Sequence, residues 1–212
     1  MDVWTAEKQR AYNAVYYQAH RDEEIERVRS RQAATLKFLR DLRCRPCADC
    51  GESFSPWVMD FDHRDPKTKS FALAAGHALL KSRHALLDEI AKCDIVCANC
   101  HAIRTYNWIK SEDVFSTRAK GISLYLARKT EYRKVQSELL ADLRTVPCYD
   151  CGRTFPNFVM QFDHRDPSEK RYVVSQMVGR AGTSTILAEV AKCDVVCSNC
   201  HRERTYQQRC AR

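Results

Sequence analysis

No stretch of this 212-residue chain stays hydrophobic for more than a few residues. A membrane-spanning helix needs about 20 consecutive, mostly apolar residues, so we expect no segment to cross a membrane. The N-terminus also lacks the apolar run of a targeting signal, and we therefore expect a cytoplasmic protein. Charged residues make up 29% of the chain and hydrophobic residues 44%, a balance that indicates a globular rather than a disordered protein.

Glycine and proline are also scarce, with six of each in the whole chain. Residues 1–45 contain neither, and residues 107–144 contain only Gly121. Because these two residue types are the strongest helix breakers, their scarcity predicts that both stretches are helical. In the first stretch, Thr5 can cap a helix over Ala6–Arg43, formed as one long helix or as two in series.

Two interpretations of this N-terminal stretch remain open. Its many arginines favour contact with DNA or with another partner. The interpretation that we prefer is that the helix packs an apolar stripe against the rest of the chain. That stripe consists of three leucines that recur every three residues, Leu36, Leu39 and Leu42.

Cysteine, by contrast, is abundant, and eight of the twelve cysteines form four Cys-x-x-Cys pairs. Since no targeting signal indicates secretion, we expect reduced, metal-bound cysteines rather than disulfides. Four thiolates satisfy a tetrahedral structural zinc ion, and the chain offers two such sets. The first is Cys47, Cys50, Cys97 and Cys100, and the second is Cys148, Cys151, Cys197 and Cys200. We expect each Zn²⁺ to supply much of the folding free energy, about 10–16 kcal/mol in small zinc peptides.

The two cysteine sets belong to a tandem duplication. Residues 47–66 match 148–167 at 13 of 20 positions, and residues 89–106 match 189–206 at 13 of 18. The predicted organisation is two zinc-containing copies, each preceded by a helical segment. Its four parts are a helical N-terminal segment over 1–44, a first zinc unit over 45–110, a helical connector over 111–144 and a second zinc unit over 145–212.

Three of the remaining cysteines lie close to these sets. Cys44 has the spacing of a pair with Cys47, but the second copy has Thr145 at the place of Cys44, so we expect Cys44 not to bind metal. Cys93 and Cys193 occur in both copies. We interpret them as small buried apolar residues, with metal binding as the alternative.

Each copy also carries an Asp-His pair between its cysteine pairs and a histidine directly after the last cysteine. These are Asp62, His63 and His101 in the first copy, and Asp163, His164 and His201 in the second. A strand is expected to lead into each Asp-His pair. Neighbouring side chains on a strand point to opposite faces, so the strand must end or bend there if the pair is to act together. The alternative makes His63 a turn residue and His101 a spare zinc ligand.

The order Cys-x-x-Cys-Gly, Asp-His-x-x-Pro, Cys-x-x-Cys-His-x-x-Arg-Thr, present in both copies, resembles the zinc-containing HNH endonuclease family. The resemblance implies the ββα-metal fold, which is a two-stranded hairpin followed by a helix around one catalytic divalent ion. We therefore expect an α+β protein with two tandem zinc-stapled units. Trp57 and Phe158 are expected to pack beneath the hairpins, and Asp65 and Asp166 to be turn residues.

The resemblance also implies roles for the surplus residues. His63 and His164 match the general base, and Asp62, His101, Asp163 and His201 match the ligands of the catalytic ion, Mg²⁺ or another divalent cation. Arg104 and Arg204 stand where a basic residue holds phosphate. The family's middle Asn has no clear match: Asp94 and Asp194 stand in its region, whereas Asn99 and Asn199 lie inside the cysteine pairs.

These residues together predict a metal-dependent endonuclease that hydrolyses phosphodiester bonds in DNA. The simplest form of this prediction is a monomer whose two copies form an internal pseudo-dimer. Each copy would then serve one strand of a duplex. The formal net charge of +8 is consistent with an anionic partner such as double-stranded DNA, and also with a merely basic surface. The alternative functions are a zinc-stabilised nucleic-acid-binding protein without catalysis, and a chain in which one copy cuts while the other positions the nucleic acid.

Overall fold

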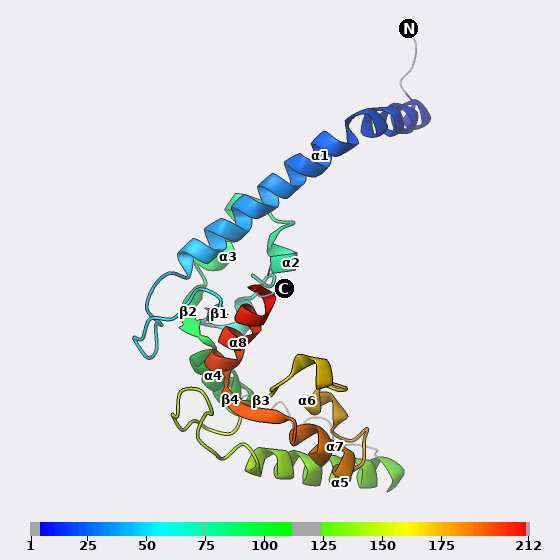
Figure 1. Ribbon diagram of the computed structural model, residues 1–212. Helices are drawn as coiled ribbons and strands as arrows, with labels where there is room; N and C mark the ends of the chain where they lie inside the picture. The colour runs from blue at the N-terminus through cyan, green and yellow to red at the C-terminus, as the bar shows by residue number, and fades with distance from the viewer. Residues whose placement is uncertain (1–4, 74, 112–123, 211–212) are drawn as a thin grey trace. The chain divides into compact units, whose positions relative to one another are not determined.

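A computed structural model describes residues 5–73, 75–111 and 124–210 (Figure 1). The structure is α+β, with helices predominating and four strands in two small sheets. The chain divides into two compact units: the first comprises residues up to Cys44 with His63–Asp94, and the second comprises Arg45–Asp62 with the chain from Ile95 onward. The cysteine sets of both copies lie in the second unit. No helix within these described ranges is long and apolar enough to cross a membrane.

The N-terminal stretch forms helix α1, Ala6–Leu42, in the first unit. The Thr5 hydroxyl accepts a hydrogen bond from the Lys8 backbone N–H at 3.3 Å, which confirms the expected N-cap. His20 has non-helical φ and ψ angles of −116° and 15°, so the helix is kinked there. The long helix predicted from the sequence is therefore present, with one interruption.

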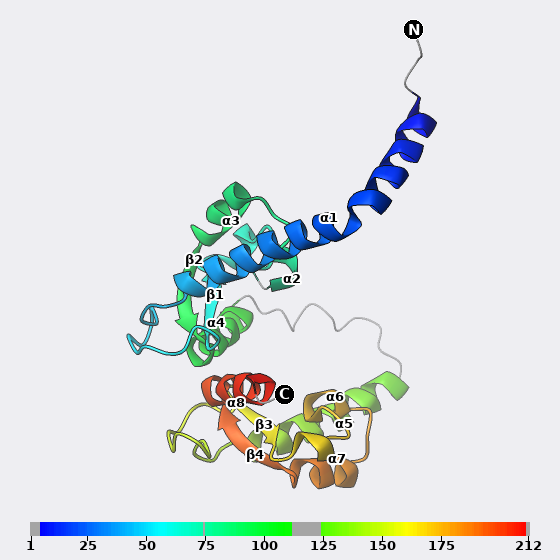
Figure 2. The ribbon, with the colours of Figure 1, turned by 45° about the horizontal axis from the view of Figure 1, so that its top comes forward.

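The C-terminal half of α1 packs within its unit against α3, Arg83–Ile90 (Figures 1 and 2). The guanidinium carbon of Arg83 lies 3.1 Å from the centroid of the Phe38 ring. Leu39 is buried, whereas Leu36 is 42% exposed, so only part of the predicted leucine stripe is used for packing.

Short helical elements separate the strands of each copy. In the first copy they are η1, Pro66–Thr68, α2, Ala75–Ala78, and α3. In the second they are η3, Pro167–Glu169, α6, Val174–Met177, and α7, Thr183–Val190. The carboxylates of Asp65 and Asp166 accept hydrogen bonds from the backbone N–H groups two residues later, which confirms their role in turns. These insertions mean that the strands are not joined by a tight hairpin turn.

Each sheet has two strands. Strand β1, Met59–His63, pairs with β2, Cys93–Cys97, and β3, Met160–His164, pairs with β4, Cys193–Cys197. The second sheet is antiparallel, with Asp163 opposite Asp194 and His164 opposite Cys193. Both β1 and β3 end at the histidine of the Asp-His pair, as expected if the pair is to act together. Pro66 and Pro167 follow three residues later, and proline does not continue a paired strand.

A helix follows each second strand directly. Helix α4, Ala98–Ser111, follows β2, and α8, Ser198–Cys210, follows β4. Cys97 and Cys197 are therefore the last residues of strands, and each helix begins at the residue that follows. The two helices lie side by side within the second unit (Figures 1 and 2).

The connector predicted as helical over 111–144 contains helix α5, Leu124–Asp142, and its residues 112–123 lie outside the described ranges. On α5, the buried Gln136 accepts a hydrogen bond from Gly179 N–H at 2.7 Å and donates one to the Ala181 carbonyl oxygen at 3.0 Å. Leu140 joins a core with Val174, Met177 and Ile186.

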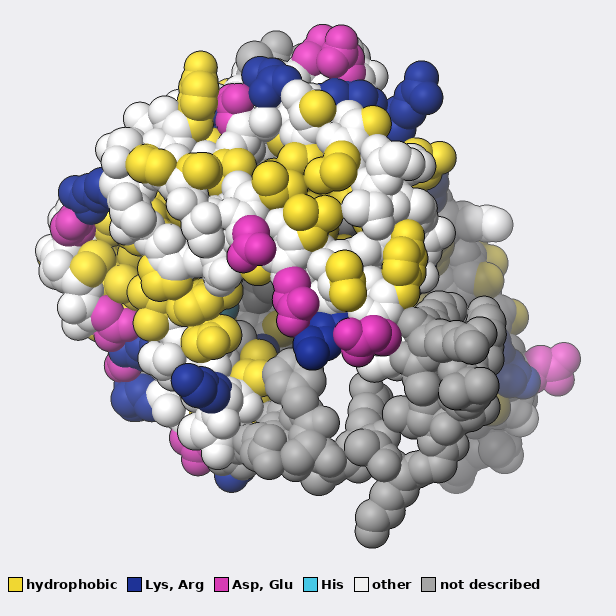
Figure 3. Space-filling model, turned by 90° about the horizontal axis from the view of Figure 1, so that it is seen from below, with side chains coloured by type: hydrophobic (Ala, Val, Ile, Leu, Met, Phe, Trp, Pro, Cys, Tyr) yellow, Lys and Arg dark blue, Asp and Glu magenta, His cyan; other side chains and the backbone are white. Residues whose placement is uncertain are grey.

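Some large hydrophobic side chains stay exposed, including Val135 at 54%. Figure 3 shows hydrophobic side chains gathered on the face seen from below.

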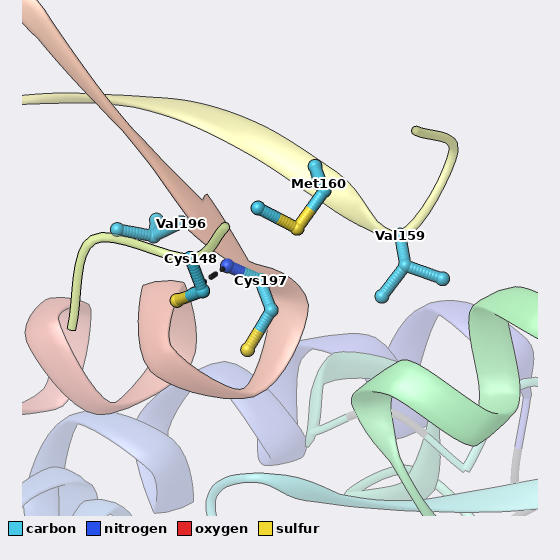
Figure 4. Close-up of a cluster of buried hydrophobic side chains, with 5 residues drawn as sticks. All are labelled: Cys148, Val159, Met160, Val196 and Cys197. Atoms are coloured by element: carbon cyan, nitrogen blue, oxygen red, sulfur yellow. Dashed lines mark hydrogen bonds between the residues drawn. The ribbon is translucent and has the colours of Figure 1, made fainter. Parts of the chain in front are cut away.

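The core beneath the second sheet contains residues of both copies. Its buried members are Cys148, Val159, Met160, Val196 and Cys197 (Figure 4). Ala102 and Ile103 of α4, which belong to the first copy, pack against them. The copies therefore share apolar packing, which is the main source of stabilisation for such an interface.

Two asparagines tie the helix starts of α4 and α8 together. The Asn99 backbone N–H donates to the side-chain oxygen of Asn199 at 2.9 Å, and the Asn199 N–H donates to the side-chain oxygen of Asn99 at 3.0 Å. Each asparagine thus satisfies a backbone donor that the first turn of the other helix leaves unpaired. Both residues are buried, so the contact has the reciprocity of a two-fold dimer interface within one chain.

Aromatic rings repeat the same two-fold arrangement. Trp57 stacks on Tyr206 with the ring centroids 3.6 Å apart, and Phe158 stacks on Tyr106 at 3.9 Å. Trp57 and Phe158 occupy equivalent positions of the two copies, as do Tyr106 and Tyr206. Phe158 also packs against the core beneath its own sheet, as expected. The sequence analysis did not foresee that both rings reach the helix of the other copy.

We predict that Asn199→Ala lowers the free energy of unfolding by about 1–2 kcal/mol, because it leaves the buried N–H of Asn99 without its acceptor. Chemical denaturation of the zinc-loaded protein would measure this. Asn157→Ala is the matched control, since Asn157 is only half-buried and makes no side-chain hydrogen bond within the described structure. Equal loss in both variants would contradict the capping role of Asn199.

Candidate metal centres and nucleic-acid site

The structure brings each predicted set of four cysteines together. The ligand atoms of each set all lie within 4.8 Å of one another. In the first set Cys47 and Cys97 are buried while Cys50 is exposed, and the second set repeats this pattern. The glycine after each first pair turns the chain, with φ of 71° at Gly51 and 68° at Gly152, a conformation that glycine adopts at little cost. Both clusters have the donors and compactness of a structural zinc site.

Backbone groups favour the thiolate of one cysteine in each cluster, whereas burial raises the pKa of Cys50 and Cys100 and of their counterparts. The Cys97 N–H donates to the sulfur of Cys47 at 3.2 Å, and Cys197 N–H donates in the same way to Cys148, as Figure 4 shows. Burial raises the pKa of Cys47, but backbone hydrogen bonds, led by that from Cys50, outweigh it and lower the pKa from 9.0 to about 7. The same causes lower the pKa of Cys148 to about 7. A thiolate is the form that binds zinc.

The other cysteines considered as metal ligands, Cys44, Cys93 and Cys193, make hydrogen bonds to backbone carbonyl oxygens. The Cys44 thiol donates to the carbonyl oxygen of Arg40 at 3.6 Å. Cys93 and Cys193 are half-buried and donate to the carbonyl oxygens of Glu89 and Glu189, each at 3.4 Å. Among the residues that the structure describes, none of the three is part of a metal-ligand cluster.

Asp163 on β3 and His201 on α8 form a second polar centre in the second copy. Nε2 of His201 lies 3.5 Å from Oδ1 of Asp163, and Nη1 of Arg204 lies 3.4 Å from Oδ2 of the same carboxylate. The cysteine cluster lies next to this centre, because Cys197 and Cys200 flank the start of the helix that carries His201. Burial lowers the pKa of His201, which favours the neutral imidazole that binds metals.

The first copy has the same arrangement with one addition. Nε2 of His101 lies 3.5 Å from Oδ1 of Asp62, as in the second copy. Nδ1 of His101 is also hydrogen-bonded to Oδ2 of Asp60 at 2.7 Å. That hydrogen bond raises the pKa of His101. Burial would raise the pKa of Asp60, but hydrogen bonds from His101 and Arg202 outweigh it and lower the pKa to about 2.

Both centres fit a divalent cation. An imidazole nitrogen and a carboxylate oxygen 3.5 Å apart can bind the same ion. Two protein ligands also leave room for the several water or phosphate oxygens that Mg²⁺ retains. The fit rests on the chemistry of the donors and on this spacing.

The predicted phosphate-binding arginines are engaged with carboxylates. Nε of Arg104 donates to Asp49 at 2.8 Å, and Nε of Arg204 donates to Asp150 at 2.7 Å. Hydrogen bonds to Asp150 are the largest cause of a raised pKa for Arg204. Each guanidinium therefore spans an aspartate of the zinc loop and the aspartate of the Asp-His pair, so a phosphate would have to compete with these ion pairs.

The Asp-His histidines contact a glutamate that the sequence analysis missed. Nε2 of His164 is hydrogen-bonded to Oε1 of Glu189 at 2.9 Å, and the two side chains are buried. In the first unit, His63 and Glu89 make the equivalent contact at 2.7 Å. The signal was present, since Glu89 and Glu189 begin the second block of identity between the copies.

Lysines and backbone donors keep these buried glutamates ionised. Glu189 accepts hydrogen bonds from Lys192 Nζ at 2.8 Å and from the backbone N–H groups of Arg171 and Tyr172. The bond from Lys192 is the largest cause that lowers the pKa of Glu189 from 4.5 to about 2. The carboxylate accepts the Nε2 proton of His164, which leaves Nδ1 as the nitrogen able to take a proton.

The family's middle Asn has no counterpart here, and an arginine directly after each Asp-His pair connects that segment to the start of the second strand instead. Arg64 donates to the carbonyl oxygens of Ala91 and Cys93 and to the carboxylate of Asp94. Arg165 makes the equivalent contacts in the second copy, including Asp194 at 3.3 Å. Asp94 and Asp194 are thus tied to the residue that follows the histidine.

A basic cleft of about 530 Å³ adjoins the centre of the second copy. His201 and Gln161 line it together with three cationic side chains, Arg133, Arg144 and Lys170. His164 lines another, more open cleft of about 390 Å³ that also includes Arg204 and Asp194. Sequence reasoning did not identify the three cations, because α5 and the segment after β3 are far apart in the chain.

Compared with models of protein families, with curated proteins and with solved structures, the chain matches none of them. The assignment of function therefore depends on the sequence motifs and on the geometry described above.

We predict that the purified protein carries two zinc ions and that Cys148→Ser carries one, because the second cluster then loses a ligand. Cys193→Ser is the matched control and should keep both ions, since Cys193 lies outside the clusters. Elemental analysis of the dialysed proteins measures the content. Loss of an ion in Cys193→Ser would instead show that this cysteine binds metal.

We also predict that Glu189→Gln lowers the free energy of unfolding by about 3 kcal/mol, because it removes the charge that pairs with Lys192 and turns an amide NH2 toward that ammonium group. The folded pKa of about 2 lies below 4.5, so the contribution is present above pH 4.5 and is lost as the pH falls toward 2. Denaturation at pH 7 would measure it. Glu169→Gln, at an exposed glutamate in the same copy, should change stability little.

Proposed function

We propose that the protein is a metal-dependent endonuclease of the HNH type that hydrolyses phosphodiester bonds in DNA. The observation that carries the proposal is the recurrence in both copies of an aspartate and a histidine 3.5 Å apart at the start of a zinc-tethered helix. A purely structural zinc module needs no such pair. The resemblance of the motifs to zinc-containing HNH endonucleases supports the same conclusion.

The proposed metal ligands in the second copy are Asp163 and His201. A bound divalent cation would supply positive charge to stabilise the phosphate and the departing oxygen. Arg204 holds the Asp163 carboxylate through Oδ2, which leaves Oδ1 directed at His201. In the first copy Asp62, His101 and Arg104 have the same roles.

The proposed general bases are His63 and His164. Glu89 and Glu189 orient these rings by accepting the Nε2 proton, so that Nδ1 is left to accept a proton from water. The cleft that His164 lines offers an approach for that water. The glutamates are positioning residues, because they act only through the imidazole.

Nucleic-acid binding is assigned to the basic cleft beside His201. Arg133, Arg144 and Lys170 offer positive charge for phosphates, and Arg144 also donates to the carbonyl oxygens of Leu140 and Met160. Arg204, by contrast, is paired with aspartates. The net charge of +8 adds a general attraction for a polyanion. Because the contacts would be to phosphate, binding should weaken steeply with salt and should show little base preference.

The pseudo-two-fold interface supports two cooperating centres. Both copies retain the aspartate, both histidines and the glutamate, so each centre has every residue to which a role is assigned above. We therefore propose that each copy cuts one strand of a duplex, as the two subunits of a homodimeric nuclease would.

The decisive experiment is incubation of zinc-loaded protein with supercoiled plasmid and Mg²⁺ or Mn²⁺. Wild type should produce linear DNA, His63→Ala and His164→Ala should each produce nicked circles, and the double variant should be about 10²–10⁴-fold slower. His84→Ala is the control, since His84 is exposed and has no counterpart in the second copy. Linear product from His63→Ala at the wild-type rate would disprove the two-centre proposal.

Folding and binding are measured on the same samples. Each variant must carry two zinc ions, and Asp163→Asn provides a second test of the same centre without removing the buried His164. DNA binding is followed over a range of salt concentrations. If wild type binds DNA but does not cut it in the presence of any divalent cation, the protein is a zinc-stabilised binding module instead.

A further inference from the structure

The two proposed metal centres differ in the group behind the histidine ligand. In the first copy, Nδ1 of His101 is hydrogen-bonded to Asp60 at 2.7 Å, while Nε2 faces Asp62. An acceptor on one imidazole nitrogen fixes the tautomer and turns the lone pair of the other toward the ion. Asp60 is four-fifths buried, so water weakens this hydrogen bond little.

The second copy has no such carboxylate. Gln161 takes the place of Asp60, and its side-chain amide donates to the Ser198 hydroxyl at 2.9 Å. The Ser198 hydroxyl in turn donates to the carbonyl oxygen of Val159 at 2.8 Å. Within the described part of the chain, no carboxylate contacts Nδ1 of His201. The ion pair of this imidazole is made by Nε2 with Asp163.

The second copy holds Asp60 in place across the internal interface. Arg202 of α8 donates from Nη1 to Oδ1 of Asp60 at 2.7 Å and from Nη2 to Oδ2 at 2.6 Å. The first copy has Ala102 at the position of Arg202, so no equivalent contact runs in the other direction. A cleft of about 400 Å³ lined by His101, Gln161 and Arg202 lies at this junction.

We propose that Asp60 positions His101 as a metal ligand, and that the first centre therefore binds a divalent cation more tightly than the second. This inference rests on the proposed function in taking both centres as metal sites. It adds that the duplication has made them unequal. Removing a carboxylate behind a histidine ligand typically weakens metal binding by about 10–100-fold, so the two affinities should differ by that factor.

An order of cutting follows from unequal affinities. At a limiting concentration of cation only the first centre is filled, so one strand is cut and nicked circles accumulate. At a higher concentration both centres are filled and linear DNA appears. The second copy nonetheless contributes to the first centre, because its Arg202 orients Asp60.

The test is titration of the full-length, zinc-saturated protein with Mn²⁺, in which electron paramagnetic resonance reports the free ion. Wild type should show one tight and one weak site, and His101→Ala should abolish the tight one. Asp60→Gln installs the side chain of the second copy and should weaken the tight site about 10–100-fold. Gln161→Asp, the reciprocal change, should strengthen the weak site.

The variant Arg202→Gln distinguishes the effect of the Asp60 carboxylate on metal binding from the effect of its ion pair with the second copy. It removes the ion pair between the copies but keeps the Asp60 carboxylate next to His101, so the tight site should weaken less than in Asp60→Gln. An equal loss in Arg202→Gln and Asp60→Gln would overturn the proposal, as would two equal sites in wild type. Two equal sites with plasmid cleavage retained would refute this inference alone, whereas no Mn²⁺ binding by folded, zinc-loaded protein would refute the metal-dependent function as well.

Discussion

The cluster of four cysteines is the constraint on which each copy depends. One pair of thiols comes from the loop before the sheet, and the other spans the junction between the second strand and its helix. Closing these pairs on one ion sets where α4 and α8 begin. His101 and His201 directly follow the last cysteine, so the zinc clusters determine where the proposed ligands of the catalytic ion lie. Small units of this size depend on such a staple because their apolar cores are too small to fold alone.

The interface between the copies shows what duplication permits. Reciprocal contacts such as Asn99 with Asn199 would serve equally well in a homodimer, in which residue i meets its own counterpart. Glu52 and Arg153 occupy equivalent positions and form an ion pair at 2.9 Å. In a homodimer this position would oppose two like charges. Two copies that differ in sequence, as in this chain, can place opposite charges there.

Several features of this protein could be predicted from residue spacing. The cysteine sets, the capped N-terminal helix, the turn aspartates and the strands that end at the Asp-His pairs follow from local rules about ligands, caps and prolines. The contacts of Glu189, of Arg202 and of the stacked rings were missed or misassigned. These residues meet partners that lie distant in the sequence, and no periodicity or spacing encodes which partner that is.

The sequence by itself therefore determined the duplication, the two sets of clustered cysteines and the candidate residues for chemistry, because each of these depends on residue type and on short separations. The tertiary structure alone decided that the copies join through α4 and α8, that buried glutamates orient His63 and His164, and that Asp60 and Gln161 stand in different surroundings. The physical reason is that burial and hydrogen bonding across the fold depend on how separate segments pack, which only the assembled chain specifies.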